Sequence, residues 1–504
     1  MNWVALLNHL PALPEAVLLV GACVVMIADT FAKDERRALT YWIAQGTLAL
    51  CLASTLFVVA FTDVKQDGNQ LYYAKYYLFN GLFVADFLSH VVKLVFYASV
   101  SATLVYSRQW LLDRGLLRGE FFSLLLFSLL GMMLLASANS FLTVFLGLEL
   151  MSLCLYALVA LNRDSALATE AAMKYFVLGA LSSGLLLYGM SMIYGATGTL
   201  SIPDVANVVR GLASSSTDHN FLVFGLVFVV AGVAFKLGVV PFHMWIPDVY
   251  HGAPTPVTLV IGSGPKLAAF AMAVRLLVNA LPALAADWQQ MLALLAILSM
   301  ALGNIAAIAQ SNLKRMLAYS AIANMGFMLL GLLSGMVDGN WLNRDSAYSA
   351  ALFYIIIYTV MSVGAFGMLC LLSRAGLDCE NLEDMRGLNR RNPWYAMLMM
   401  LLMLSLAGLP PTAGFYAKLA VFNAAVSAGY VWLAVAAVLL SLVGAYYYLR
   451  IVKLMYFDEP RDAAPAAAPA QGGVLMSVNG LALLFFGIVP GPLMDLCTVA
   501  IASL

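Results

Sequence analysis

The residues of this chain best suited to chemistry are charged side chains that interrupt long apolar segments. Glu149 lies in SFLTVFLGLELMSLCLYALVAL and Lys236 lies in VVAGVAFKLGVVPFHMW, and neither has another charged residue within ten positions. Lys266 follows a Gly-Ser-Gly-Pro break, and Lys418 follows a double-proline break. A charge at the centre of a membrane helix costs about 2.5–3.5 kcal/mol. These side chains therefore predict a polar interior and a function that offsets the cost.

Proton movement is the chemistry that these residue types suit. Burial weakens the hold of a lysine on its proton, and a nearby carboxylate strengthens it. A buried lysine whose carboxylate partner comes and goes can therefore bind and release a proton at neutral pH. His243, seven residues after Lys236, titrates near neutrality unaided. It is explained equally well as a polar group that bonds carbonyls freed at a helix break.

Other charges within apolar segments have simpler explanations. Asp86 and Lys93 are seven residues apart and share one helix face, which is consistent with a structural ion pair or snorkelling as well as with function. Lys174 lies four residues after Glu170, the spacing of a helical ion pair, and a functional role is an equal alternative. Arg275 is expected to snorkel toward the membrane surface.

Sequence motifs for cofactors do not occur in the chain. It contains no CxxC, HExxH, GxGxxG or GxxxxGK[ST] pattern. We therefore expect no metal ion, nucleotide, flavin or iron–sulfur cluster in this chain. The cysteines are expected to be small apolar packing residues, and they are Cys23, Cys51, Cys154, Cys370, Cys379 and Cys497.

Composition specifies the elements that must position these residues. Hydrophobic residues make up 63% and charged residues 10% of the 504 residues, whereas soluble proteins carry about 25% charged residues. This excludes a cytosolic enzyme and a disordered scaffold, and a net charge of zero leaves no basic face for nucleic acid. Apolar runs near 20 residues predict an all-α polytopic membrane protein. We predict fourteen transmembrane spans, at 12–32, 40–61, 81–106, 119–137, 140–161, 169–195, 220–248, 256–280, 288–309, 315–335, 347–373, 394–422, 428–456 and 474–498.

The distribution of lysine and arginine predicts the orientation. Sixteen of them lie in connections after odd-numbered spans, and only Lys65, Lys75, Arg210 and Arg344 lie in connections after even-numbered spans. Positive residues favour the cytoplasmic side, so both termini are predicted to be periplasmic. The segment PRDAAPAAAPAQGG (460–473) is predicted to be a flexible cytoplasmic linker.

Proline breaks two of the predicted spans next to a lysine. Pro241 follows Lys236 in span seven, and Pro410 and Pro411 precede Lys418 in span twelve. Broken membrane helices mark ion paths near the midplane, where other groups satisfy the freed carbonyls. The five-span interval predicts two inverted five-helix repeats, spans 4–8 and 9–13. The predicted domains are a three-helix segment (1–118), the first repeat (119–280), the second repeat (281–456), and the linker with the last span (457–504).

Three stretches resemble one known family. They are AFKLGVVPFHMWIPDVYHGAPTPVTLVIGSGPKLAAF (234–270), LGLELMSLCLYAL (146–158) and LAGLPPTAGFYAKL (406–419). They resemble the antiporter-like proton-pumping subunits of respiratory complex I, the NADH:quinone oxidoreductase. Within these, the chain is most similar to the bacterial subunit N family, the counterpart of mitochondrial subunit 2. The motif PDVYHGAPTPV, Lys418 in place of the Glu of subunit M, and an end after span fourteen favour this family over M and L.

The resemblance implies roles for individual residues in proton translocation. Glu149 and Lys236 match the buried ion pair of the family. Lys266 matches the central lysine between two half-channels, and Lys418 matches the exit-side lysine toward the periplasm. His243 matches a polar link in the central axis, and Lys174 matches a basic position whose role is less settled.

The resemblance also implies a setting for the chain. NADH, FMN, iron–sulfur clusters and quinone would be bound by other subunits of the complex. Partners would be an M-type antiporter-like subunit, small membrane subunits and lipid, without nucleic acid. The chain would be a multi-pass protein of the bacterial inner membrane.

Two other functions are open to a chain of this type. A subunit of a multi-subunit cation/proton (Mrp-type) antiporter would share the Glu–Lys–Lys pattern, so those residues do not separate the two. A membrane scaffold would gain nothing from buried lysines, because leucine would serve it better. The post-break motif favours the complex I family.

Overall fold

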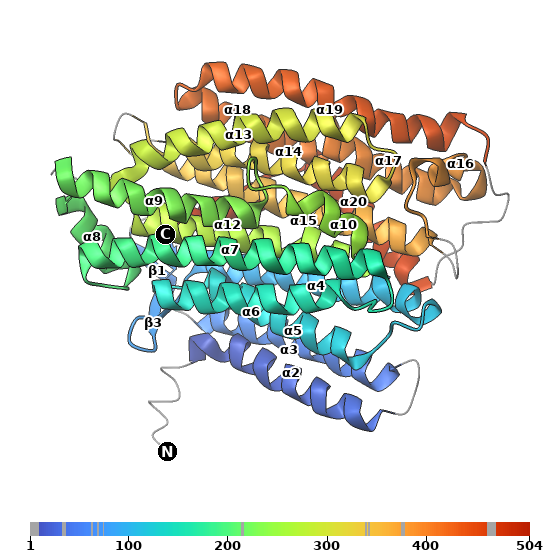
Figure 1. Ribbon diagram of the computed structural model, residues 1–504, viewed down its shortest axis with the longest axis horizontal. Helices are drawn as coiled ribbons and strands as arrows, with labels where there is room; N and C mark the ends of the chain where they lie inside the picture. Colours follow the sequence, from blue (N-terminus) through green and yellow to red (C-terminus); the bar gives the residue numbers. More distant parts are fainter. Residues whose placement is uncertain are drawn as a thin grey trace.

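The molecule is a stack of long helices that lie side by side along its longest axis (Figure 1). The computed structural model describes residues 10–32, 37–61, 64–67, 70–73, 75–212, 216–337, 340, 343–373, 378–460 and 470–504. Within these residues, thirteen helices are long and apolar enough to cross a membrane. The predicted all-α polytopic membrane architecture is confirmed.

Residues 10–280 contribute eight of these helices, of which the eighth is divided into three segments. The first seven are unbroken. They are α2 (Leu13–Phe31), preceded by η1 (Leu10–Ala12), α3 (Ala38–Phe61), α4 (Phe87–Asp113), α5 (Gly119–Ala136), α6 (Phe141–Val159), α7 (Ala166–Thr197) and α9 (Ser216–Leu237). A short helix, α8 (Ile202–Leu212), lies between α7 and α9, and α10 (Trp245–Gly252) follows α9. The eighth span consists of α11 (Thr255–Gly262), α12 (Gly264–Ala273) and the π-helix η2 (Val274–Ala280).

The second half continues the stack. Its elements are η3 (Pro282–Leu284), α13 (Ala285–Ile308), α14 (Leu313–Leu333), α15 (Arg344–Leu372), η4 (Leu382–Met385), α16 (Leu388–Arg391), α17 (Pro393–Ala407), α18 (Ala413–Ser427), α19 (Val431–Phe457), α20 (Ala470–Ile488) and α21 (Gly491–Ala502). The expected span 394–422 is divided between α17 and α18, so neither half is counted among the thirteen long helices.

Two short hairpins, which the sequence analysis did not predict, connect α3 to α4. Strands β1 (Val64–Asp67) and β2 (Gln70–Tyr73) pair antiparallel, and so do β3 (Tyr76–Leu78) and β4 (Phe83–Ala85). Asp86 follows β4 directly and caps α4, because its Oδ1 accepts a hydrogen bond from the Ser89 backbone N–H at 2.9 Å. The hairpins, α8 and the C-terminus lie at one end of the stack, and α16 lies at the other (Figure 1).

The helices of the middle layer are enclosed by protein. Thr255–Ala280, α14 and α15 are almost wholly buried, whereas α2, α3, α19 and α20 keep much of their surface outside. A lysine in the middle layer therefore cannot reach lipid or bulk water with its ammonium group. It has to find partners inside the protein.

Both predicted breaks are present, and they share one local pattern. Helix α9 ends at Leu237 and α17 ends at Ala407, and each is followed by a glycine with a left-handed backbone, Gly238 (φ 75°) and Gly408 (φ 81°). A proline stands three residues after each glycine, at Pro241 and Pro411. The predicted break in span 220–248 therefore separates α9 from α10. The inverted relation of the two five-span units and the domain boundaries stay predictions.

Some predictions concern residues that lie outside the described part of the chain. These include most of the predicted linker, residues 461–469, and four basic residues of the connections predicted to be cytoplasmic, Lys33, Arg36, Arg374 and Arg461. The end of the predicted linker is wrong, because residues 470–473 form the first turn of α20.

Candidate functional site

Lys266 on α12 is held against the broken end of α9. Its ammonium group donates a hydrogen bond to the Leu237 carbonyl at 2.6 Å and lies 5.0 Å from the centre of the Trp245 ring. The side chain is almost completely buried. Leu237 is the last residue of α9, so its carbonyl has no partner within that helix. Lys266 therefore satisfies a carbonyl that the break has freed.

Lys418 on α18 repeats this arrangement at the second break. Its ammonium group donates to the Ala407 carbonyl at 2.8 Å and to Ser441 Oγ at 2.8 Å, and it lies 4.7 Å from the centre of the Phe327 ring. Ala407 is the last residue of α17. The negative end of a helix dipole thus faces each ammonium group.

Glycine is required beside both lysines. A Cβ at Gly238 would lie 2.8 Å from Lys266 Nζ and 1.9 Å from Ile246 Cδ1. A Cβ at Gly408 would lie 2.6 Å from Lys418 Cδ. These distances are too short for carbon, so the lysines pack on bare backbone. Among the described residues, neither lysine forms an ion pair with a carboxylate.

Glu149 and Lys236 do not form the direct ion pair that the resemblance implies. Lys236 donates to Ser152 Oγ at 2.9 Å and lies 3.5 Å from Tyr156 Oη. The Oε1 atom of Glu149 is buried and has no hydrogen-bond partner in the described structure. Glu149 lies on the same helix as Ser152 and Tyr156, the two side chains that Lys236 contacts. Hydroxyl groups of α6 therefore take the place of the carboxylate as the hydrogen-bond partners of Lys236.

The sequence analysis missed Ser152 and Tyr156, although a signal for them exists. Glu149, Ser152 and Tyr156 are spaced i, i+3 and i+7, which places them on one face of α6. His243 lies between α9 and α10, and its Nδ1 is buried without a hydrogen-bond partner among the described residues. It makes no recorded contact with Lys236 or Lys266, so the predicted link stays a prediction.

The expected pairing of Asp86 with Lys93 is wrong. Asp86 forms a bidentate ion pair with Arg275, at 2.7 Å and 2.9 Å, and Arg275 also donates to the Ala136 carbonyl at 2.7 Å. Lys93 pairs instead with Glu15 on α2 at 2.6 Å. Arg275 does not snorkel, since only 3% of its surface is exposed. Asp86 and Lys93 share a helix face, but each forms its ion pair with a residue of another helix.

Lys174 forms the predicted ion pair with Glu170, at 2.7 Å. It also contacts Asp248 on α10 at 2.8 Å, and Asp248 contacts Arg315 on α14 at 2.9 Å. The sequence analysis missed Asp248, which links the first and second halves of the chain. The predicted spans 288–309 and 315–335 leave Lys314 in the connection between them.

Lys314 is in fact buried at the start of α14. It pairs with Glu380 at 2.8 Å and donates to the Ala253 carbonyl at 2.8 Å. A basic residue near a predicted span end is therefore a poor guide to exposure in this chain, because short connections fold back over the helices.

A buried polar network runs through the second half. Asn324 accepts from the Tyr354 hydroxyl at 2.8 Å and donates to the Tyr448 hydroxyl at 3.4 Å, and Tyr448 is bonded to Ser320. These residues lie on α14, α15 and α19. The network provides groups that both donate and accept protons in the enclosed middle layer.

No metal centre is evident in the part of the chain that the structure describes. It holds no group of three or more His, Cys, Asp or Glu side chains placed to bind a metal ion. All six cysteines are free thiols, and five of them are buried.

Comparisons with known proteins identify the family of the chain. The family model for the transmembrane part of NADH:quinone oxidoreductase and Mrp antiporter subunits matches residues 138–444. The chain is 56% identical over 499 residues to NADH-quinone oxidoreductase subunit N of Herminiimonas arsenicoxydans, with 98% of each chain covered.

Solved structures give the same fold. A chain of respiratory complex I from Thermus thermophilus with bound aureothin is 33% identical, with 96% of this chain and 98% of that chain covered and a TM-score of 0.76. A chain of the Mrp complex from Dietzia sp. DQ12-45-1b has a TM-score of 0.84 at 21% identity, with 100% of this chain and 98% of that chain covered. The likeness to the Mrp chain, at 21% identity, shows a shared fold. The 56% identity to subunit N along nearly the whole chain is much more specific evidence for a family. The chain therefore belongs to the NADH-quinone oxidoreductase subunit N family.

Proposed function

We propose that this membrane-arm subunit of NADH:quinone oxidoreductase translocates protons through Glu149, Lys236, Lys266 and Lys418, with His243 as a secondary group. The proposal assigns the chain to the translocase class and places no redox centre in it. NADH, FMN, iron–sulfur clusters and quinone are then bound elsewhere in the complex.

The observation that carries the proposal is the pairing of Lys266 and Lys418 with backbone carbonyls. A lysine paired with a carboxylate leaves an unpaired buried charge when it loses its proton, which costs several kcal/mol. A lysine bonded to a carbonyl avoids this penalty, because the neutral amine keeps N–H groups that still donate to the same oxygen. The contacts at Leu237 and Ala407 therefore suit both protonation states.

The hydroxyl groups around Lys236 suit proton transfer in the same way. Ser152 accepts a hydrogen bond from Lys236, and a hydroxyl can donate its own proton while it accepts another. Glu149, on the same face of α6 as Ser152, adds a carboxylate that has no fixed bond to Lys236. Changes in its distance or protonation would alter how tightly Lys236 holds its proton.

We assign structural roles to three residues that the sequence analysis left open. Asp86, Lys93 and Lys174 all form ion pairs in the structure, so their charges are already compensated. This assignment separates the proposed relay from the residues that hold helices together.

The expected surroundings complete the proposal. The partners would be an M-type antiporter-like subunit, small membrane subunits and lipid. The subunit would span the bacterial inner membrane with both termini on the periplasmic side. The excess of basic residues in odd-numbered connections supports this orientation.

Substitution of the two carbonyl-bonded lysines tests the proposal. Lys266→Met and Lys418→Met should each abolish most NADH-driven dye quenching in inverted membrane vesicles, and quinone reduction should fall with it. Lys453→Met is the matched control, because Lys453 is an exposed lysine paired with Asp458 at 2.5 Å. Normal pumping by a fully assembled Lys266→Met or Lys418→Met complex would contradict the relay.

The Mrp-type antiporter remains the alternative for the fold, but no observation on this chain favours it over complex I. A deletion strain separates the two functions. Loss of NADH:quinone oxidoreductase activity is expected, whereas an antiporter subunit would leave that activity intact and sensitise cells to sodium.

A further inference from the structure

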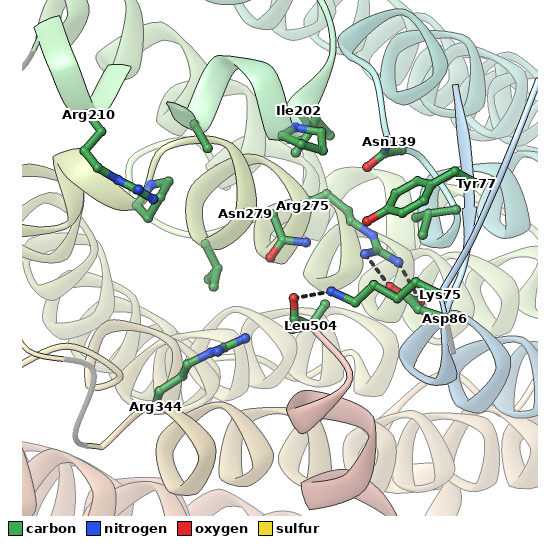
Figure 2. Close-up of a pocket in the computed structure, with 15 residues that line it drawn as sticks. Lys75, Tyr77, Asp86, Asn139, Ile202, Arg210, Arg275, Asn279, Arg344 and Leu504 are labelled. Carbon is green, nitrogen blue, oxygen red and sulfur yellow. Dashed lines mark hydrogen bonds and ion pairs between the residues drawn. The ribbon is translucent and has the colours of Figure 1, made fainter. Parts of the chain in front are cut away.

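Basic residues from three separate connections meet in one pocket. Lys75, Arg210 and Arg344 belong to the connections after spans two, six and ten, and together with Arg275 they line a cavity of about 360 Å³ (Figure 2). Only four basic residues occur in the even-numbered connections of the whole chain. Because basic residues are scarce at this end of the molecule, their concentration in one cavity calls for an anion.

The positive charges in this pocket are not balanced within the described structure. Arg275 pairs with Asp86, and Lys75 donates to the Leu504 backbone oxygen at 2.6 Å. Arg210 and Arg344 have no hydrogen-bond or ion-pair partner among the described residues. The lining thus holds four cationic side chains against two carboxyl groups, the side chain of Asp86 and the terminal carboxyl of Leu504, so positive charge remains in excess.

The charges act on one another across the cavity. Burial lowers the pKa of Lys75, Asp86 opposes this change, and the positive charges of Arg275 and Arg344 lower the pKa further. An additional anion in the cavity would relieve this repulsion.

The geometry favours an anion with several oxygen atoms. Arg210 and Arg344 extend toward the cavity from different sides, and the amide of Asn279 lies between them and Arg275 (Figure 2). Guanidinium groups present paired donors that match phosphate oxygens. The cavity volume lies in the range of about 300–1,000 Å³ that is typical of small-ligand sites. Ile202 and Val278 add apolar wall next to these donors.

We propose that this pocket binds a phosphate group, which is supplied by an anionic phospholipid of the adjacent leaflet or by free phosphate. Arg210 and Arg344 are the residues that contact the phosphate oxygens, and Asn279 adds a neutral donor. Arg275 stays bonded to Asp86 and fixes the floor of the pocket. The proposal does not depend on the proton relay, since none of these residues belongs to it.

Binding to the purified, delipidated complex tests this site. One arm measures equilibrium binding of radiolabelled phosphatidylglycerol in detergent micelles, and the other measures binding of radiolabelled orthophosphate. The variants are Arg210→Gln, Arg344→Gln and the double variant. Arg118→Gln is the matched control, because Arg118 is also exposed and without a recorded partner but follows an odd-numbered span.

Each single pocket variant should weaken binding by about tenfold, as expected for the loss of a charge-assisted hydrogen bond. The Arg118→Gln complex should bind like the wild type. Loss of phosphatidylglycerol binding alone identifies lipid as the source, and loss of orthophosphate binding alone identifies the free ion. If the double-variant complex binds each probe as tightly as the wild-type complex does, the proposal is overturned. The counter-ion would then be an acidic group of a neighbouring subunit.

Assembly of the variants is checked by NADH:quinone reduction, which should be unchanged. If Arg344→Gln prevents assembly, Arg210→Gln alone decides the outcome. Arg210 is exposed on α8, and glutamine has a helix propensity close to that of arginine.

Discussion

Replacement of Gly238 by alanine should disconnect Lys266 from the broken end of α9. Gly238 has φ 75°, and a Cβ there would lie 2.8 Å from Lys266 Nζ and 1.9 Å from Ile246 Cδ1. The left-handed backbone costs an alanine about 1–2 kcal/mol. Displacement of the ammonium group from the Leu237 carbonyl adds about 1.5–3 kcal/mol for a hydrogen bond to a charged group. The total is about 2.5–5 kcal/mol.

Gly429→Ala provides a control that isolates the backbone contribution. Gly429 has φ 84°, and no atom lies within 4 Å of the position its Cβ would take. This variant should lose only the cost of the left-handed backbone, about 1–2 kcal/mol. The difference between the two variants is therefore the cost of crowding Lys266 and Ile246.

The assay compares dye quenching and quinone reduction in inverted vesicles, with heat inactivation of the complex as the measure of stability. Gly429→Ala should lower the inactivation temperature slightly and pump normally. Gly238→Ala should lower that temperature further and reduce pumping about tenfold or more, as the lost hydrogen bond implies. If Gly238→Ala pumps as well as Gly429→Ala, the contact between Lys266 and the Leu237 carbonyl has no part in proton transfer.

Three further outcomes are expected. The Lys418→Arg complex should assemble but pump poorly in the same vesicles, because a guanidinium group stays protonated and cannot pass its proton on. If this variant pumps as well as the wild type, position 418 needs only a permanent positive charge. Glu15→Leu should lower the stability of the complex to heat by about 3–5 kcal/mol, because it leaves Lys93 buried and unpaired. The double variant Glu15→Leu/Lys93→Met should regain most of that stability. If the double variant is stable but pumps poorly, the pair is instead part of the relay. Serine at all six cysteine positions should leave the iron–sulfur and flavin signals of the purified complex unchanged, and loss of any of these signals would reveal a cofactor site in this chain.

Helix positions and breaks could be predicted from the sequence because hydropathy and proline act locally. Pro241 and Pro411 mark the two breaks without knowledge of any neighbour. The isolated Glu149 and Lys236 also stand out, because a lone charge in an apolar run needs no structure to be noticed.

Pairing between helices could not be predicted in the same way. Arg275 reaches Asp86 across 189 positions, and Lys93 reaches Glu15 on α2. Sequence spacing reports only which residues share a face of one helix, whereas pairing depends on how helices pack. The carbonyl partners of Lys266 and Lys418 were equally hidden, since every residue has a backbone carbonyl and only the fold selects one.

The position of Asp248 between two cations has a consequence for movement within the subunit. One carboxylate serves Lys174 on α7 and Arg315 on α14, so either cation can withdraw while the carboxylate keeps the other. A displacement of α7 or α14 that breaks one contact therefore leaves Asp248 with the other counter-ion. Helix α10, which carries Asp248 and directly follows the break beside Lys266, can tilt with either neighbour at little electrostatic cost. The shared carboxylate thus joins the two halves of the chain directly beside the broken segment, through two contacts that can be lost one at a time.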